Sequence, residues 1–453
     1  MKKYILLSLL IGLLFGACKK DDPNAGGDGQ DDQLNTDLQE ALKTASNGVG
    51  VDYYKLPTGE DLSQIPQDPN NPLTEAKVKL GKLLYHETGL AINPMKEISR
   101  GTYSCASCHF ASAGFQAGRF QGISEGGVGF GVNGEGRQKG ALYAGGEIDV
   151  QPLRTPTSMN GAYQKNNLWN GQFGATGINE GTEALWTAGT PKETNLLGYE
   201  GLETQAIAGL KVHRMGANEE FLSLYPIYKT YIDEAFPDVD STERYTRTTM
   251  GLAVGAYERT LLSSKAPFQE WLRGDNAAMS DTEKKGAILF FGKAKCANCH
   301  NGPALSSMEF YAYGMKDLNT CPEEVFQADN AGANLGRGGF TNVAADNYKF
   351  KVPQLYNLAD SPFYGHGASL RSLREVVMYK NNGVAENAAV PASQLAADFV
   401  PLNLTNEEVD AITAFMEKSL RDPDLGRYQP ESVPSGNCIP VNDPLSKNEL
   451  GCN

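Results

Sequence analysis

Basic residues and strand patterns are both scarce in this chain of 453 residues. Its 40 lysines and arginines are outnumbered by 54 acidic residues, which gives a net charge of −14. No basic stripe is present to neutralise phosphates, so we expect no nucleic-acid partner, although a basic protein is allowed. Long apolar runs are missing too, because the run at 5–15 is too short to span a membrane. The composition is typical of a globular protein with long loops.

The start of the chain predicts export. A charged start precedes the apolar run, as in a secretory signal, and residues 15–18 (FGAC) resemble a lipobox. We therefore expect 1–17 to be a signal peptide and Cys18 to carry a lipid anchor. Residues 19–22 (KKDD) resemble the tag that sends some Gram-negative lipoproteins to the outer membrane, on its periplasmic side, or to the cell surface. The polar composition that follows predicts a disordered tether over 18–65.

Four of the eight cysteines form two copies of one pattern. Residues 105–109 read CASCH and residues 296–300 read CANCH, and C-x-x-C-H is the attachment pattern for haem c. Two residues between the thiols let both sulfurs reach the vinyl groups on one edge of a porphyrin, while the next histidine ligates the iron. The predicted haem-binding residues are Cys105, Cys108, His109, Cys296, Cys299 and His300.

Other uses of these cysteines fit less well. A four-cysteine zinc site does not call for a histidine after each second cysteine, and a redox dithiol seldom recurs with one attached. Haem c is attached outside the cytoplasm, which agrees with export. In that oxidising space Cys438 and Cys452 can form a disulfide that staples the C-terminal tail, with Cys321 unpaired or replacing one of them. The spacing leaves these pairings open.

Helical patterns surround both motifs. An apolar stripe at 76–84 precedes the first motif, and a capping box at 280–283 opens a helix that ends near Gly292, before the second. Another capping box at 405–408 opens a helix with an apolar face over 409–416. We predict a mainly α protein in which two cytochrome c-like haem domains pack together, with long loops and few strands.

The polar stretch 274–279 is the predicted domain boundary. It gives an N-terminal haem domain at 66–274, a C-terminal haem domain at 280–425 and a C-terminal tail at 426–453. No tight repeat is visible beyond the two haem motifs, which excludes a solenoid.

Most of the chain, from about 75 to 425, resembles the bacterial dihaem cytochrome c peroxidase family, which includes the MauG-type enzymes. The segments that carry this resemblance are 80–85 (LGKLLY), 154–157 (RTPT), 168–171 (LWNG), 350–353 (FKVP) and 362–366 (PFYGH). The resemblance implies an N-terminal haem that meets peroxide and a C-terminal haem of higher potential that accepts electrons. It also implies that Trp169 lies between the two haems and shortens the electron-transfer gap.

The resemblance places the peroxide site on residues 202–205 (LETQ) and 212–216 (VHRMG). Gln205 matches the glutamine of the family, but His213 and Arg214 stand where the family has an acid–base glutamate. We expect His213 to act as acid and base and Arg214 to stabilise the leaving anion. Alternatively, His213 ligates the iron and closes the site, or both residues are structural.

For the second haem, the helix at 373–380 is expected to supply a sixth ligand. Met378 offers a thioether, which raises the potential, whereas the ligand position of the family aligns with Lys380. A lysine ligand must be neutral, which requires a depressed pKa. Residues two apart on a helix face nearly opposite ways, so only one of them can reach the iron.

Two further features follow from the resemblance. The family often holds Ca²⁺ near the segment 360–362 with help from an asparagine, but Arg154 stands at the asparagine position, and a guanidinium disfavours a second cation there. His366 lies between glycines beside the second haem. It tunes that haem, contacts its propionates or has no ligand role.

The leading interpretation is an oxidoreductase that reduces hydrogen peroxide to water, with electrons from a small redox protein entering at the C-terminal haem. MauG-like oxidation of a protein or small molecule and a non-catalytic dihaem electron carrier are the alternatives. The missing glutamate favours the carrier, whereas Gln205 and Trp169 oppose it. A homodimer is compatible with the resemblance, and the expected contact with a membrane is through the lipid anchor alone.

Overall fold

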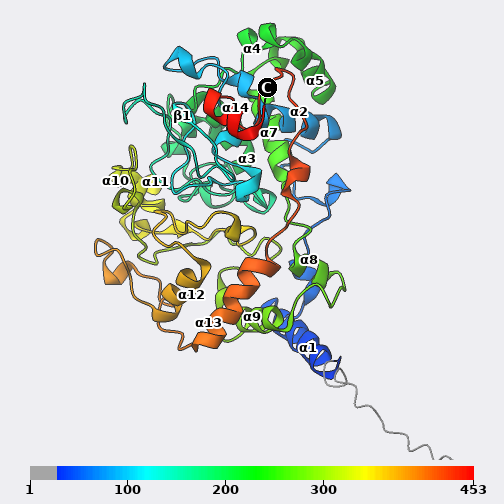
Figure 1. Cartoon of the computed structure of the whole chain (residues 1–453), viewed down its shortest axis with the longest axis vertical. Helices are drawn as coiled ribbons and strands as arrows, with labels where there is room; N and C mark the ends of the chain where they lie inside the picture. Colours follow the sequence, from blue (N-terminus) through cyan, green and yellow to red (C-terminus); the bar gives the residue numbers. More distant parts are fainter. Residues whose placement is uncertain (1–27, 453) are drawn as a thin grey trace, which may run out of the picture.

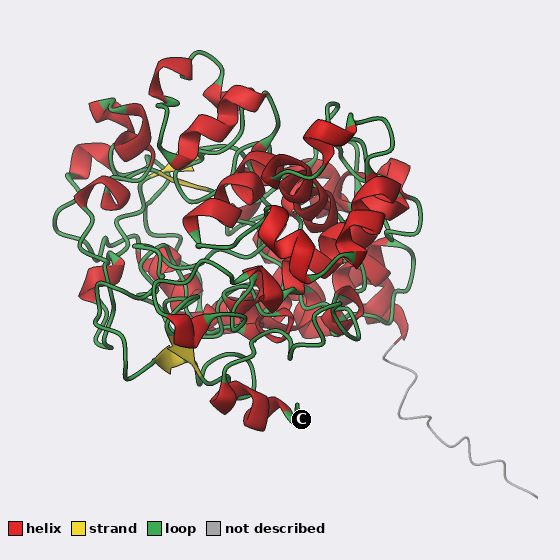
Figure 2. Cartoon of the chain, turned by 90° about the horizontal axis from the view of Figure 1, so that it is seen from above, coloured by secondary structure: helices red, strands yellow, loops and turns green. Residues whose placement is uncertain are grey.

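Helices carry this fold, and strands contribute little. The computed structural model describes residues 28–452. Over these residues the strands are two residues long: β1 (Gly127–Val128) pairs antiparallel with β2 (Gln138–Lys139), and β3 (Phe310–Tyr311) with β4 (Phe350–Lys351). Figure 2 shows the helices joined by abundant loops. The predicted mainly α fold with long loops and few strands is confirmed.

A first core forms around two long helices of the N-terminal part. Helix α2 (Glu75–His86) packs along α7 (Arg247–Arg259), which also receives α3 (Gly201–Val212). A Cβ at Gly81 would lie 1.9 Å from the carbonyl oxygen of Ala253, so only glycine permits this close approach. The outer helices of this part are α4 (Glu219–Leu224), α5 (Ile227–Ala235) and α6 (Ser241–Arg244).

A second core repeats this arrangement in the C-terminal part. Helix α9 (Asp281–Phe291) packs on α13 (Asn406–Ala414), and Ser280 and Thr405 cap them as predicted. A Cβ at Gly286 would again lie 1.9 Å from a carbonyl oxygen, that of Ala411. The remaining helices of this part are α8 (Pro267–Leu272), α10 (Ala331–Asn334), α11 (Arg337–Thr341) and α12 (Leu373–Asn382).

The prediction of a disordered tether over 18–65 is wrong from residue 28 onward. Helix α1 (Asp28–Ala45) lies against α9 (Figure 1), with Leu38 and Leu42 fully buried in the second core. The indole of Trp271 donates a hydrogen bond to Asn35 at 2.8 Å. The composition of this segment is polar, but its few apolar residues recur at helical spacing and form one stripe. Packing of this stripe on the second core offsets the entropy that is lost when the segment becomes ordered. The predicted signal peptide and Cys18 lie outside the described residues.

The predicted boundary at 274–279 does not separate the two cores. Phe268 and Trp271, which precede it, belong to the second core, whereas Leu425 and Tyr428, near the C-terminal end, pack with the first. Because α1 already lies in the second core, the chain crosses between the two cores three times. Within the described chain, no helix combines the length and the apolar character needed to cross a membrane.

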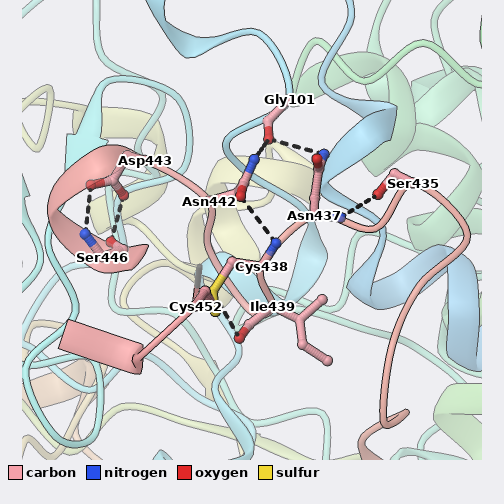
Figure 3. The surroundings of a disulfide bond; sticks show 9 residues. All are labelled: Gly101, Ser435, Asn437, Cys438, Ile439, Asn442, Asp443, Ser446 and Cys452. Carbon is pink, nitrogen blue, oxygen red and sulfur yellow. Dashed lines mark hydrogen bonds between the residues drawn. A yellow bond between two sulfur atoms is a disulfide. The ribbon is translucent and has the colours of Figure 1, made fainter. Parts of the chain in front are cut away.

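The C-terminal tail returns to the first core, where it ends in α14 (Pro444–Leu450; Figure 1). Cys438 and Cys452 form a disulfide, which confirms the predicted staple (Figure 3). Beside it, the side-chain amide of Asn442 donates to the carbonyl of Gly101 at 2.9 Å (Figure 3). Ser107, inside the first haem motif, donates to the carbonyl of Pro440 at 3.1 Å. The tail thus supports the first haem motif directly.

Candidate active site

A cavity of about 1150 Å³ lies between the two cores. Both predicted haem motifs line it, and none of their four thiols is in a disulfide. The volume exceeds the roughly 300–1,000 Å³ of a pocket for one small ligand. The structure therefore brings all six predicted haem-binding residues to one space that is large enough for more than one bulky group.

The two motif histidines present the same nitrogen to this cavity. The Nδ1 atom of His109 lies 3.1 Å from the carbonyl oxygen of Phe115, and that of His300 lies 3.1 Å from those of Leu305 and Pro353. A carbonyl only accepts, so Nδ1 carries the hydrogen and Nε2 keeps its lone pair. Burial lowers the pKa of both histidines to about 4, which keeps them neutral. Neutral imidazoles oriented in this way are suited to ligate iron.

Near the first motif, residues at intervals of four along α3 and at its C-terminal cap line the cavity. They are Gln205, Gly209 and His213. A Cβ at Gly209 would lie 3.5 Å from the Gln205 amide nitrogen and 3.8 Å from the His213 ring, so glycine leaves the space between these polar groups open. The structure thus places Gln205 and His213 together at the cavity, as predicted.

Asp149 orients His213. Its carboxylate accepts a hydrogen bond from Nδ1 of His213 at 2.7 Å, and its own side chain lines the cavity. Burial opposes the charge on His213, but the Asp149 carboxylate outweighs it and holds the pKa of the imidazole above its ordinary value. Sequence reasoning missed Asp149, because no local pattern links two residues that lie 64 positions apart.

Arg214 does not reach the cavity, contrary to the prediction that it stabilises a leaving anion. Its guanidinium donates to Glu125, which is fully buried, at 2.5 Å and to the carbonyl of Glu147 at 3.2 Å. The backbone at Arg214 is left-handed (φ 54°), which turns the side chain away from the face that carries His213. Arg214 therefore tethers the loop that holds Asp149.

Trp169 lies at the cavity where the two parts of the chain meet. It is half-buried, and its indole donates to the carbonyl of Arg154 at 2.8 Å. The ring centroid of His366 is 6.4 Å away, and His366 in turn stacks on Phe350 at 3.7 Å. Trp169 is therefore a wall of the cavity between the two motifs rather than a side chain of either core.

Arg154 joins the two parts of the chain. Its buried guanidinium donates to Ser361 at 2.8 Å, to the side chain of Gln116 at 2.9 Å and to the carbonyl of Arg119 at 2.8 Å. Burial lowers its pKa to about 9. These contacts occupy the place where the resemblance would put a calcium ion. Over residues 28–452 no cluster of three or more His, Cys, Asp or Glu side chains is arranged to hold a metal ion.

On the second side, Lys380 reaches the cavity and Met378 does not. Met378 packs on the second core, whereas the Lys380 ammonium lies 3.0 Å from the ring centroid of Tyr313. Burial lowers the pKa of Lys380 to about 8, against the opposing charge of Asp398. Of the two predicted candidates for a sixth ligand, the geometry brings only the lysine to the space beside the second motif.

Two helical cores, each presenting a C-x-x-C-H turn and a neutral histidine to a shared cavity, define a dihaem c-type cytochrome. Residues 75–277 match the family model described as di-haem cytochrome c peroxidase. This match covers less than half of the chain, and over these residues the chain is similar to that family. The two C-x-x-C-H motifs predict two covalently bound haem c groups, and the similarity agrees with a dihaem oxidoreductase of the peroxidase or MauG type.

Individual relatives cover most of the chain. It is 28% identical over 361 residues to the methylamine utilization protein MauG of Methylorubrum extorquens, which is 79% of this chain and 82% of that protein. It is 29% identical over 336 residues to cytochrome c peroxidase Ccp of Escherichia coli K12, which is 74% of this chain and 58% of that protein. A solved MauG-like protein associated with microbial copper homeostasis has a TM-score of 0.58 at 21% identity, covering 86% of this chain and 99% of that one.

Proposed function

We propose that this protein is a peroxidase that reduces hydrogen peroxide to water, in the balance H₂O₂ + 2 H⁺ + 2 e⁻ → 2 H₂O. The observation that carries the proposal is the polar face opposite His109, where Gln205 and His213 flank an open glycine and Asp149 orients the imidazole. A plain electron carrier has no use for a charged acid–base pair at one of its two haems.

The roles of the residues follow from their positions. When bound, the haems supply iron that binds peroxide and exchanges electrons. His213 holds its free Nε2 as a base that accepts a proton from peroxide and returns it to the departing oxygen, while Asp149 fixes the tautomer. Gln205 offers an amide hydrogen to the same space. Positioned proton transfer of this kind contributes about 10²–10⁴-fold to a rate.

The second side supports the entry of electrons. We propose Lys380 as the sixth ligand of the C-terminal haem, because it reaches the cavity and burial favours its neutral form. A ligand there closes that iron to peroxide and leaves the site at His109 for the chemistry. Trp169 lines the cavity that both motifs line, and we propose that its ring shortens the distance that electrons cross between the haems. A small redox protein is the proposed donor.

We also propose that the protein acts outside the cytoplasm, anchored by a lipid on Cys18 at the periplasmic side of the outer membrane or at the cell surface. The disulfide between Cys438 and Cys452 supports an oxidising compartment.

The decisive experiment is turnover of the full-length holoprotein with hydrogen peroxide and a reduced small cytochrome. We expect peroxide-dependent oxidation of the donor and a high-spin ferric signal from one of the two haems. Oxidation of an added protein or small molecule without turnover of the donor would instead indicate MauG-like chemistry. Two low-spin haems in both oxidation states, with no reaction, would leave only electron transfer.

A further inference from the structure

Lys351 is a buried cation at the junction of the two parts of the chain. It is the last residue of β4, where it pairs with Phe310 of β3, and its backbone N–H donates to the carbonyl of Trp169 at 2.8 Å. These contacts hold its backbone from both sides. The side chain is only 7% exposed, lines the cavity and contacts the side-chain oxygen of Gln164.

The charge of Lys351 has no counter-ion in the described part of the chain. Its hydrogen-bond partner, Gln164, is neutral, and no carboxylate forms an ion pair with it. Two other buried cations do have a carboxylate partner: Arg259 binds Glu203 at 2.7 Å, and Arg137 binds Asp443 at 3.4 Å. Burial without an anion lowers the pKa of Lys351 to about 7. A buried ammonium without an anion is costly, so an anion brought by a group from outside the chain would stabilise the charged form of Lys351.

The cavity itself indicates which anion this is. A haem attached through its two vinyl groups keeps two propionate carboxylates on the opposite edge of the porphyrin, so the group that fills this cavity brings negative charge. Lys351 also lies two residues before Pro353, whose carbonyl accepts the hydrogen bond from His300. The same short segment therefore orients the second iron ligand and presents the cation.

We propose that the Lys351 ammonium binds a propionate of the haem attached at Cys296 and Cys299, and that this ion pair sets the reduction potential of that haem beside Trp169. The proposal rests on the presence of the two haems and not on peroxide as substrate. Neutralising a propionate removes negative charge near the iron, which favours the reduced, less positive state. A high potential at the haem on His300 would then depend in part on one lysine.

The test compares midpoint potentials in the full-length holoprotein by spectroelectrochemistry. Lys351→Met removes the charge at similar volume, and we expect the reduction equilibrium constant of the C-terminal haem to fall about tenfold, which is 59 mV for one electron. Lys351→Arg should restore it. Lys349→Met is the matched control, because Lys349 lies two residues away, pairs with Asp346 and does not line the cavity.

Lys351→Gln provides a second neutral variant in case the methionine variant does not fold, and haem content and circular dichroism verify the fold of each protein. Resonance Raman bands of the propionates should change in both neutral variants but not in Lys351→Arg. Unchanged potentials of both haems in a folded neutral variant would overturn the proposal. A shift confined to the N-terminal haem would overturn the assignment to the C-terminal one. Absence of peroxide turnover in the unmutated holoprotein, with the shift in potential still seen in the neutral variants, would count against the proposed function alone.

Discussion

The two haem sites hold their motif histidines in the same way, but different side chains line the cavity around them. In each, a glycine lets the helix before the motif approach a partner helix, with Gly81 on Ala253 and Gly286 on Ala411. In each, the histidine donates from Nδ1 to a backbone carbonyl. The two sites therefore use the same means to attach a haem and to orient its histidine ligand.

The faces opposite the two histidines share nothing. The first carries Gln205 and the His213–Asp149 pair beside an open glycine, whereas the second carries Lys380 against the ring of Tyr313. One side can move protons, and the other can close on a metal ion. In the proposed function, these residues, and not the attachment motif, divide the labour between the two sites.

Removing the thiols of one site should have the largest effect. Replacing Cys105 and Cys108 by alanine should remove one haem from the mass spectrum and abolish peroxide turnover, because the acid–base face then has no iron opposite it. Replacing Cys296 and Cys299 should remove the other haem and block electron supply from a redox protein. Cys321→Ser is the control and should keep both haems. Peroxide turnover by the first variant would contradict the division of labour.

The next effect concerns the acid–base face. His213→Ala should lower kcat/KM for peroxide by about 10²–10⁴-fold, because it removes the imidazole that Asp149 orients at the cavity. Stopped-flow mixing with peroxide measures it. Met378→Leu, on the second core, is the control and should leave the rate unchanged. An unaltered rate in the alanine variant would show that His213 does not transfer protons in the reaction with peroxide.

We expect the disulfide to stabilise the first haem site more than the second. Cys452→Ser should lower the free energy of unfolding by about 3 kcal/mol, because it frees the tail whose Pro440 carbonyl holds Ser107. Urea unfolding followed at each haem should show the loss at the first core before the second. Cys321→Ser serves again as the reference. Equal loss at both haems would mean that the tail does not distinguish them.

The smallest effect is a shift along the pH axis. His213 must be neutral to accept a proton, so kcat/KM should fall as the pH drops through its pKa. The Asp149 carboxylate raises that pKa, and Asp149→Asn should therefore move this fall to lower pH. The pH profile of kcat/KM measures the shift, and His213→Ala should lose this limb of the profile. A limb that stays in place would exclude the pair as its origin.

Features that depend on neighbouring residues were predicted well. The haem motifs and the caps at Ser280 and Thr405 follow from spacing along the chain, whereas Gln205 and His213 were named through the resemblance to a family. Features that depend on packing were not. The turn at Arg214 points its side chain to Glu125, and a polar N-terminal segment became a buried helix because the second core offered it an apolar surface.

Attachment of a haem depends on residues that are close in sequence, because the two thiols and the histidine of each motif lie within five residues. It therefore does not depend on how the rest of the chain folds. Which side chains face a haem depends instead on residues that are far apart in sequence. Asp149 meets His213 across 64 residues, Lys351 meets Gln164 across 187, and Ser107 meets Pro440 across 333. Such contacts arise when whole helices and loops pack, and in the proposed function they decide which haem reacts and which one passes electrons.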